Sequence, residues 1–200
     1  MADLQEFLES RSTTRSYLPK PIEPDRLQRI MEAAPFAPSA HNRQPWRFVV
    51  ISDAAKKESL ARGMGERLQA DRTADGDDAT AIEADVARSS KRITDAGAVI
   101  VCCLTMEDMD TYPDDKRNSA EHWMAVQSAA MAAHNIILAA HAEGLGACWM
   151  CAPLFCGDAV VETLELPEHW IPQALITMGW EDKPPRKRER LPVEKIARFL

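Results

Sequence analysis

The stretch Ala37-Pro38-Ser39-Ala40-His41-Asn42-Arg43-Gln44-Pro45-Trp46-Arg47-Phe48 runs directly into Val49-Val50-Ile51. Its first half is a proline-bounded loop of small and amide side chains, a composition that presents backbone and side-chain hydrogen bonds to small polar ligands. Its second half, from Trp46 to Ile51, is rich in β-branched residues and is predicted to be a strand. The stretch therefore predicts a ligand-binding loop at the start of a core strand.

The composition limits the classes of protein to consider. A chain of 200 residues is long enough for one well-buried domain, so we expect a single domain over 1–200. The net charge of −7 argues against general nucleic-acid or anionic-membrane binding. No apolar run approaches the ~18 residues of a membrane span, and the polar, acidic start is unlike a signal peptide. We therefore expect a cytoplasmic protein with no nucleic-acid or membrane partner.

The cysteines are odd in number, which is typical of reduced thiols in a chain without a secretory signal. Cys148-x-x-Cys151 admits a metal or redox interpretation, but no second Cys/His pair has zinc-ligand spacing. A thioredoxin-like site needs a helix that begins within the motif, whereas Ala147 to Met150 is predicted to be a strand. We therefore favour buried or loop cysteines and no metal, with a redox role as the alternative. The five cysteines are Cys102, Cys103, Cys148, Cys151 and Cys156.

Hydrophobic periodicity predicts an α+β fold, with helices around a small mixed sheet. Gly97 to Leu104 has no polar alternation, so both faces of this strand should be covered. An acidic segment, 71–78, is expected to be an exposed and mobile break between two helices. The remaining predicted elements are helices at 3–9, 24–34, 54–70, 80–93 and 158–164, strands at 147–150 and 174–178, and a last short helix from Val193.

A long helix is predicted to begin at Asn118, with Glu121 completing a capping box, and to end near Ala142 before Gly144. Alanines surround this helix, so it is apolar on nearly every side. Such a helix must be buried, and in a domain of this size it is either central or part of a subunit interface. This pattern predicts a homodimer.

Two basic segments are candidates for binding phosphate. Arg11-Ser12-Thr13-Thr14-Arg15 combines two guanidiniums with three hydroxyls, which suits phosphate oxygens, although a polar turn explains it equally well. Lys183 to Arg190 carries five positive charges and one negative charge. Because a predicted apolar helix follows, we expect this segment to be anchored at both ends.

The sequence lacks the usual catalytic signatures. It has no G-x-x-x-x-G-K-[ST] loop, no G-x-G-x-x-G after a strand, no H-E-x-x-H and no G-x-S-x-G. His134 and His141 lie two turns apart on the long helix and are interpreted as structural or water-facing. We therefore predict no catalytic side chain and a cofactor that supplies the reactivity.

Three motifs together resemble the nitroreductase family of FMN-dependent oxidoreductases. They are Arg11-Ser-Thr-Thr-Arg15-Ser-Tyr17, the segment 37–46, and Arg188-Glu-Arg190-Leu-Pro192. Within that family the chain is similar to the flavin domain of the bifunctional coenzyme F420 biosynthesis enzyme. The tracts that carry this second likeness are Tyr112-Pro-Asp-Asp, Ala120-Glu-His122, Gly144 to Trp149 and Leu164-Glu-Leu-Pro167.

The resemblance implies an intertwined homodimer with two FMN sites at its interface, and it assigns residues to them. Ser12 replaces an Arg or His that is frequent in the family, and Cys151 replaces a Gly or Glu. The implied contacts are Arg11, Ser12, Arg188 and Arg190 to the phosphate, Thr13 to the ribityl chain, Arg15 to the N1/C2=O edge, Pro38, Ser39, Ala40 and Asn42 from the partner subunit, the backbone of Met150, Cys151 and Ala152 near N5, and Asp71 to the substrate.

The implied reaction is hydride transfer from NADH or NADPH through FMN N5 to a small electron acceptor: a nitroaromatic, a quinone or a conjugated alkene. Donor and acceptor would use one open flavin face in turn, which gives ping-pong kinetics. The alternatives are a reductase of an F420 precursor or related deazaflavin, a flavin-binding module without turnover, and a phosphate-ligand binding protein without flavin.

Overall fold

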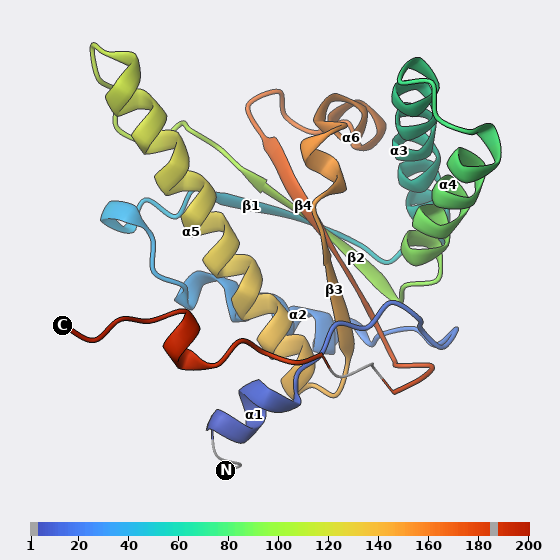
Figure 1. The fold of residues 1–200 in the computed structure, drawn as a ribbon, viewed down its shortest axis with the longest axis horizontal. Helices are drawn as coiled ribbons and strands as arrows, with labels where there is room; N and C mark the ends of the chain where they lie inside the picture. The colour runs from blue at the N-terminus through green and yellow to red at the C-terminus, as the bar shows by residue number, and fades with distance from the viewer. Residues whose placement is uncertain (1–3, 185–187) are drawn as a thin grey trace.

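A computed structural model describes residues 4–184 and 188–200 and shows helices packed around one four-stranded sheet (Figure 1). The strand order is β1-β2-β4-β3, and all three ladders are antiparallel. An isolated parallel bridge joins Thr13, which lies outside the strands, to Ala147, so the four-stranded sheet itself is antiparallel and not mixed as predicted. The predicted α+β class is confirmed. The strands are β1 (Trp46–Ile51), β2 (Ala98–Leu104), β3 (Gly146–Met150) and β4 (Ile171–Gly179).

The interior strand β2 is buried at every residue, as its unbroken apolar sequence predicts. Its alternate side chains enter two separate cores. Ile100 and Leu104 pack with α2 (Pro24–Glu32) and α5 (Asp115–Ala142). Val99 and Val101 pack with α3 (Ala54–Ala74) and α6 (Gly157–Leu164) on the opposite face. The remaining helical elements are α1 (Leu4–Ser10), α4 (Ala79–Thr94), η1 (Ala34–Phe36), η2 (Ala40–Asn42), η3 (Ala152–Leu154) and η4 (Val193–Lys195).

The break between α3 and α4 is shorter than predicted, because α3 extends into the acidic segment as far as Ala74 and α4 begins directly after it, at Ala79. Asp78 caps α4 by accepting a hydrogen bond from the backbone N–H of Ala81. Arg72, in the last turn of α3, pairs with Asp77 and with Asp85 across the hairpin. The helical hairpin thus neutralises part of the acidic charge. As a result, Asp71 lies within α3 rather than in a loop.

Helix α5 ends where expected, but the prediction that Asn118 caps it is wrong. Asp114 is the N-cap, and its carboxylate accepts a hydrogen bond from the backbone N–H of Arg117. Asn118 lies inside the helix and bonds instead to both backbone groups of Tyr112. Only one face of α5 is buried in this chain, whereas Trp123 on the other face is 63% exposed.

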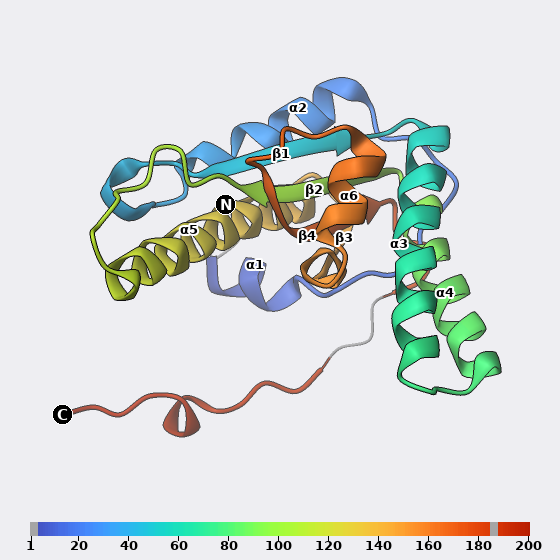
Figure 2. The same cartoon turned by 90° about the horizontal axis from the view of Figure 1, so that it is seen from above.

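The C-terminal segment is not anchored on the chain's own body, contrary to our expectation. The predicted last helix is a single 3-10 turn, and residues 188–200 are all exposed. Figure 2 shows this tail leaving the body on the side of α1. Arg186 and Lys187 of the basic segment lie outside the described residues. The apolar side chains exposed on the tail are Leu191, Val193, Ile196, Phe199 and Leu200.

Candidate functional site

The segment Arg11 to Tyr17 is held in an extended form between β3 and the chain that follows β4. The backbone N–H of Thr14 donates to Ala147 O at 3.0 Å, and Thr14 Oγ1 donates to Glu181 Oε1 at 2.5 Å. Thr14 is only 3% exposed, so these bonds fix the segment from its buried side. Arg11, Thr13 and Arg15 are therefore presented by a backbone that is bonded to the sheet.

Gly146 allows this close approach. A Cβ atom at position 146 would lie 2.5 Å from Thr14 Cβ and 2.5 Å from Thr14 Oγ1, closer than side chains pack. Nearby, the Tyr17 hydroxyl lies 2.8 Å from Thr14 O and 2.9 Å from Thr177 O, and burial raises its pKa. The absence of a side chain at Gly146 thus leaves the space that Thr14 of the basic segment occupies.

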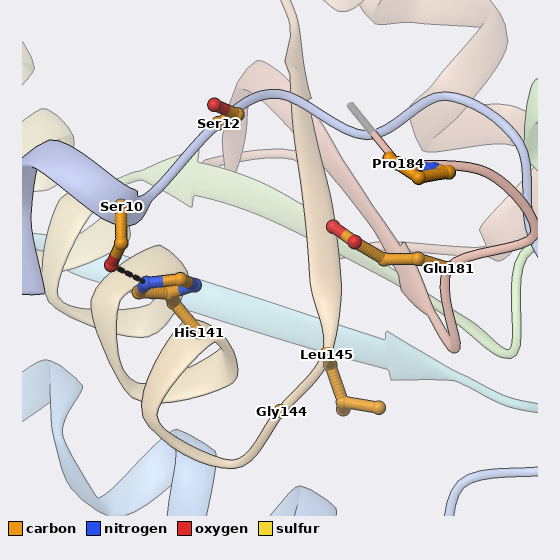
Figure 3. Close-up of a pocket in the computed structure, with 7 residues that line it drawn as sticks. All are labelled: Ser10, Ser12, His141, Gly144, Leu145, Glu181 and Pro184. Atoms are coloured by element: carbon orange, nitrogen blue, oxygen red, sulfur yellow. Dashed lines mark hydrogen bonds between the residues drawn. The ribbon is translucent and has the colours of Figure 1, made fainter. Parts of the chain in front are cut away.

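Neighbouring residues of the extended segment line different cavities, because alternate side chains of an extended chain point to opposite sides. Ser12 faces a cavity of about 400 Å³ (Figure 3). In that cavity Ser10 Oγ lies 2.8 Å from His141 Nε2, and the Glu181 carboxylate points inward. Arg11 faces a second cavity, of about 430 Å³. The structure therefore does not bring Arg11 and Ser12 side chains into one cavity.

The second cavity, which we call the Arg11 cavity, is lined on one side by the basic segment and β3 and on the other by α5. Among the described residues, neither Arg11 nor Arg15 forms an ion pair. Its volume falls in the usual range for small-molecule sites. A guanidinium without a carboxylate partner is free to bind an anionic ligand. The lining residues are Arg11, Thr13, Ala130, His134, Ile137, Ala147 and Trp149.

Arg15 lies beside the β3 residue Cys148. Burial raises the pKa of the Cys148 thiol, while the positive charges of Arg15 and Arg92 oppose that rise. Both guanidiniums therefore contribute positive charge near this part of the sheet edge. This is the part of β3 from which the chain continues to Met150 and Ala152.

The end of β3 carries the residues predicted to lie near N5. Trp149 Nε1 donates to Cys151 Sγ at 2.9 Å. Ala152 begins η3 and shares a cavity of about 90 Å³ with Asp71, so the structure does bring these two predicted residues together. The other residues of this small cavity are Met64, Arg67, Leu68, Ser89, Phe155 and Cys156.

The exposed thiol of Cys151 gives a direct test of this arrangement. The other four cysteines are buried, and burial raises the pKa of Cys156 to about 11 and that of Cys103 to about 12. A thiol is reactive only as an exposed thiolate. We expect a disulfide-exchange reagent at pH 7.5 to titrate one thiol in the native protein and all five after unfolding. Rapid titration of two or more native thiols would contradict the burial pattern.

The loop from Pro38 to Gln44 has an unusual backbone. His41, Asn42 and Gln44 have φ values of 50°, 54° and 50°, which residues other than glycine adopt at a cost. The loop is fixed by a bond from Gln44 N to Ser39 Oγ at 3.1 Å and by one from Ala40 N to Ser128 Oγ at 3.3 Å. The loop that the sequence predicts to bind a ligand is thus held in a defined, preformed conformation.

The loop and the Arg11 cavity lie on opposite sides of α5. Ser128, which the loop contacts, is on the buried face of the helix, whereas Ala130 and His134 are exposed and line the cavity. Within one chain, Pro38 to Asn42 therefore do not line the cavity that holds Arg11. A ligand that contacts both must lie between two copies.

Arg188 and Arg190 are exposed on the tail, and Figure 2 shows the tail apart from α1. The hydrogen bond described for Arg190 runs to Arg188 O at 3.5 Å. The single chain thus does not bring either arginine against Arg11, and their role at a phosphate stays a prediction.

Sequence reasoning missed three features of the site: His134, Trp149 and Gly146. His134 is exposed, in agreement with the water-facing interpretation, and it also lines the Arg11 cavity. The sequence contains a signal for this position, because Trp123, Gln127, Ala130 and His134 follow one another at spacings of three and four residues and so share one face of α5. Gly146 gives no sequence signal beyond the helix-ending Gly144-Leu-Gly.

The sequence predicts neither a metal site nor a membrane-spanning helix. In residues 4–184 and 188–200, no three metal-ligating side chains converge on one point. In the same residues, no helix is both long enough and apolar enough to cross a membrane.

Known proteins resemble this chain in sequence and in fold. The Nitroreductase family profile matches residues 8–180. A protein of Methanothermobacter thermautotrophicus that bears the name NADH dehydrogenase/NAD(P)H nitroreductase is 27% identical over 198 residues, which cover 97% of this chain and 85% of that protein.

Two solved structures share the fold. One is a protein of Desulfovibrio desulfuricans that is named as a nitroreductase and was solved in complex with FMN. It has a TM-score of 0.76 at 23% identity, and the aligned part covers 98% of this chain and 96% of that chain. The other is the NADPH:FMN oxidoreductase of Vibrio harveyi, complexed with NAD+. It has a TM-score of 0.73 at 20% identity, and the aligned part covers 98% of this chain and 76% of that chain.

Proposed function

Since the chain belongs to the nitroreductase family, we propose that it binds FMN in the Arg11 cavity and transfers electrons from NADH or NADPH to a small acceptor. The acceptor classes are nitroaromatics, quinones and conjugated alkenes. The observation that carries the proposal is the pair Arg11 and Thr13, fixed on the sheet edge in a cavity of about 430 Å³ without a carboxylate partner for Arg11 among the described residues. The family relatives named for FMN and nicotinamide chemistry support it.

The donor set suits FMN. A guanidinium offers a fork of N–H donors to phosphate oxygens, and a threonine hydroxyl complements it or a ribityl hydroxyl. Trp149 and Ile137 supply the apolar wall of the same cavity. Bound FMN supplies hydride transfer at N5, which the protein's own side chains do not provide.

The chain's residues then have binding and orienting roles. Arg11 holds the phosphate, and Arg15 places positive charge beside the end of β3, where it favours a negatively charged ligand edge. The backbone groups of Met150, Cys151 and Ala152 face the reactive edge. No side chain is proposed as a proton donor, because water in an open site can supply protons.

We propose that the protein forms a homodimer. Pro38, Ser39, Ala40 and Asn42 of one copy reach the Arg11 cavity of the other, which explains why the preformed loop lies on the far side of α5 in its own chain. The exposed apolar tail packs on the second copy, and Arg188 and Arg190 come to the phosphate with it. Burying the tail removes large apolar side chains from water.

The absorption spectrum of the purified protein tests the proposal. We expect a yellow protein, or an apoprotein that takes up one FMN per chain, and we expect anaerobic NADH or NADPH to bleach it. A colourless protein that does not bind FMN would overturn the proposal and favour a phosphate-ligand binding protein. Bound FMN that neither nucleotide bleaches would indicate a flavin-binding module without turnover.

Turnover with a panel of acceptors then identifies the substrate class. The panel is a nitroaromatic, a quinone, a conjugated alkene and a dehydro-F420-type deazaflavin. A large preference for the deazaflavin would support the alternative of a biosynthetic reductase and contradict the leading choice of acceptors. Asp71→Asn should change acceptor preference and leave FMN affinity unchanged, because Asp71 lies in the small cavity beside Ala152 and not in the Arg11 cavity.

A further inference from the structure

Lys57, near the start of α3, is a buried lysine that the proposed function does not use. Its side chain is 7% exposed, although lysine is seldom buried without an acidic partner. Within residues 4–184 and 188–200 it forms no ion pair. Its Nζ atom donates instead to Ala96 O at 2.5 Å and to Thr94 O at 3.2 Å. The amine is thus held by backbone oxygens at the end of the neighbouring helix α4 (Figures 1 and 2).

Lys57 and its two acceptor residues line a cavity of about 300 Å³, which we call the Lys57 cavity. Its walls come from segment 18–21, from Ser52 after β1, and from the chain that joins α4 to β2. Such a volume is at the lower end of the range for small-molecule sites. The Lys57 cavity and the Arg11 cavity share no lining residue, so a ligand of one does not occupy the other.

Burial favours the neutral form of the Lys57 amine. Removing the ammonium from water lowers the pKa of Lys57, and the carboxylates of Asp95, Asp53 and Glu58 only partly oppose this shift. Two carbonyl acceptors use two N–H groups, which is the number that a neutral amine has. The lone pair of the neutral amine then has no partner among the described residues. A neutral amine at the wall of a cavity can act as a nucleophile.

A second lysine brings positive charge to the Lys57 cavity. Lys20 lines the cavity, and its Nζ atom lies 3.7 Å from the centre of the Trp180 ring. Lys20 also lacks an ion pair in the part of the chain that the structure describes. Asp95, the acidic residue of the lining, is paired with Lys91 at 2.6 Å, which partly neutralises its charge. An anionic group that enters the cavity is therefore attracted to Lys20.

We propose that Lys57 binds small aldehydes or ketones covalently, and that Lys20 selects those that carry an anionic group. The Lys57 nitrogen attacks the carbonyl carbon, and the resulting carbinolamine loses one water molecule to give an imine. From the neutral amine, formation of the protonated imine takes up one proton from water and needs no oxidant or reductant. The protonated imine keeps one N–H, which donates to Ala96 O, while Thr94 O is released to water.

Borohydride trapping followed by peptide mapping tests the proposal in the wild-type protein. Pyridoxal phosphate is the probe, because it combines an aldehyde with a phosphate. We expect one reduced adduct per chain, at Lys57, formed at least roughly tenfold faster than an adduct at the exposed neighbour Lys56, since only a neutral amine attacks a carbonyl. The described lining of the Arg11 cavity contains no lysine, so probe bound there cannot give this adduct. No adduct, or adducts without a preference for Lys57, would overturn the proposal.

Lys57→Arg separates the reaction of this side chain from its role in the fold. Arginine keeps N–H donors for Thr94 O and Ala96 O, but it does not form the imine because it stays protonated. We expect Lys57→Arg to lose the fast adduct, and the matched control Lys56→Arg to keep it. A fast adduct in folded Lys57→Arg would overturn the proposal. If Lys57→Arg does not fold, the mapping of the wild-type protein decides.

Pyridoxal, which lacks the phosphate, tests the role of Lys20. For each probe the rate at Lys57 is divided by the rate at Lys56, which corrects for the different intrinsic reactivities of the probes. We expect this ratio to be roughly tenfold larger for pyridoxal phosphate, because an ammonium forms a charge-assisted hydrogen bond with phosphate. In Lys20→Met the two ratios should be equal. If pyridoxal phosphate keeps its advantage in Lys20→Met, the selection by Lys20 is wrong. None of these outcomes depends on FMN, so failure of the proposed function would leave them unchanged.

Discussion

Replacing Arg11 by alanine should raise the Kd for FMN roughly 10- to 100-fold, because a hydrogen bond to a charged group contributes about 1.5–3 kcal/mol. Arg11 faces the cavity of about 430 Å³ and has no carboxylate partner among the described residues. Its loss removes no ion pair from the fold, so the unfolding temperature of the apoprotein should change little. Fluorescence titration of apoprotein with FMN measures the affinity.

Two further variants separate charge from geometry at this site. Arg11→Lys keeps the charge but not the planar fork of donors, so its affinity should lie between those of the wild type and Arg11→Ala. Arg62→Ala removes an exposed guanidinium on α3, away from the cavity, and should bind FMN as the wild type does. Equal affinities for all four proteins would show that the phosphate is bound elsewhere.

Gly146→Ala should both destabilise the protein and weaken FMN binding. The new Cβ would meet Thr14 at 2.5 Å, and Thr14 is bonded to Ala147 O on one side and Glu181 on the other. Overpacking of this kind costs about 1–3 kcal/mol. Relief requires the Arg11 segment to move away from β3, so the FMN affinity should fall together with the unfolding free energy measured in urea.

The control for this substitution is Gly157→Ala. A Cβ there would meet only Pro172 Cδ at 3.8 Å, which is ordinary contact. We expect its stability and FMN affinity to stay close to those of the wild type. If Gly146→Ala unfolds at the same urea concentration as Gly157→Ala, the close approach of Thr14 is not a constraint on the fold.

Elements that are defined by local pattern could be predicted from the sequence. Trp46 to Ile51 is strand β1, as its β-branched residues predict, and the apolar run from Gly97 to Leu104 contains β2 from Ala98 onward. Helix α5 ends before Gly144, as its glycines indicate. The predicted N-cap of α5, Asn118, lies four residues after the observed N-cap, Asp114. Asp114 and Asn118 are equally good caps by residue type, and only the fold of Tyr112 back onto Asn118 decides between them.

The site could be predicted only in parts. Arg11, Thr13 and Asp71 line cavities of the single chain, and their roles toward FMN and substrate stay predictions. The separation of Ser12 from Arg11 could not be foreseen, since it depends on the extended backbone that Thr14 fixes. The loop at Pro38 to Asn42 and the arginines of the tail lie apart from the cavity in the single chain, and no local pattern in the sequence indicates that separation.

The bonds that hold the Arg11 segment also set the order in which the protein is assembled. Thr14 is bonded to Ala147 and Glu181, and Ser16 to Asp182, so residues made early are joined to residues made more than 130 positions later. Contacts so far apart in the chain carry a large cost in loop-closure entropy, which slows folding. During synthesis the segment therefore leaves the ribosome long before its partners exist. Loading with FMN is expected to follow translation of residue 182 and to report that the sheet has closed.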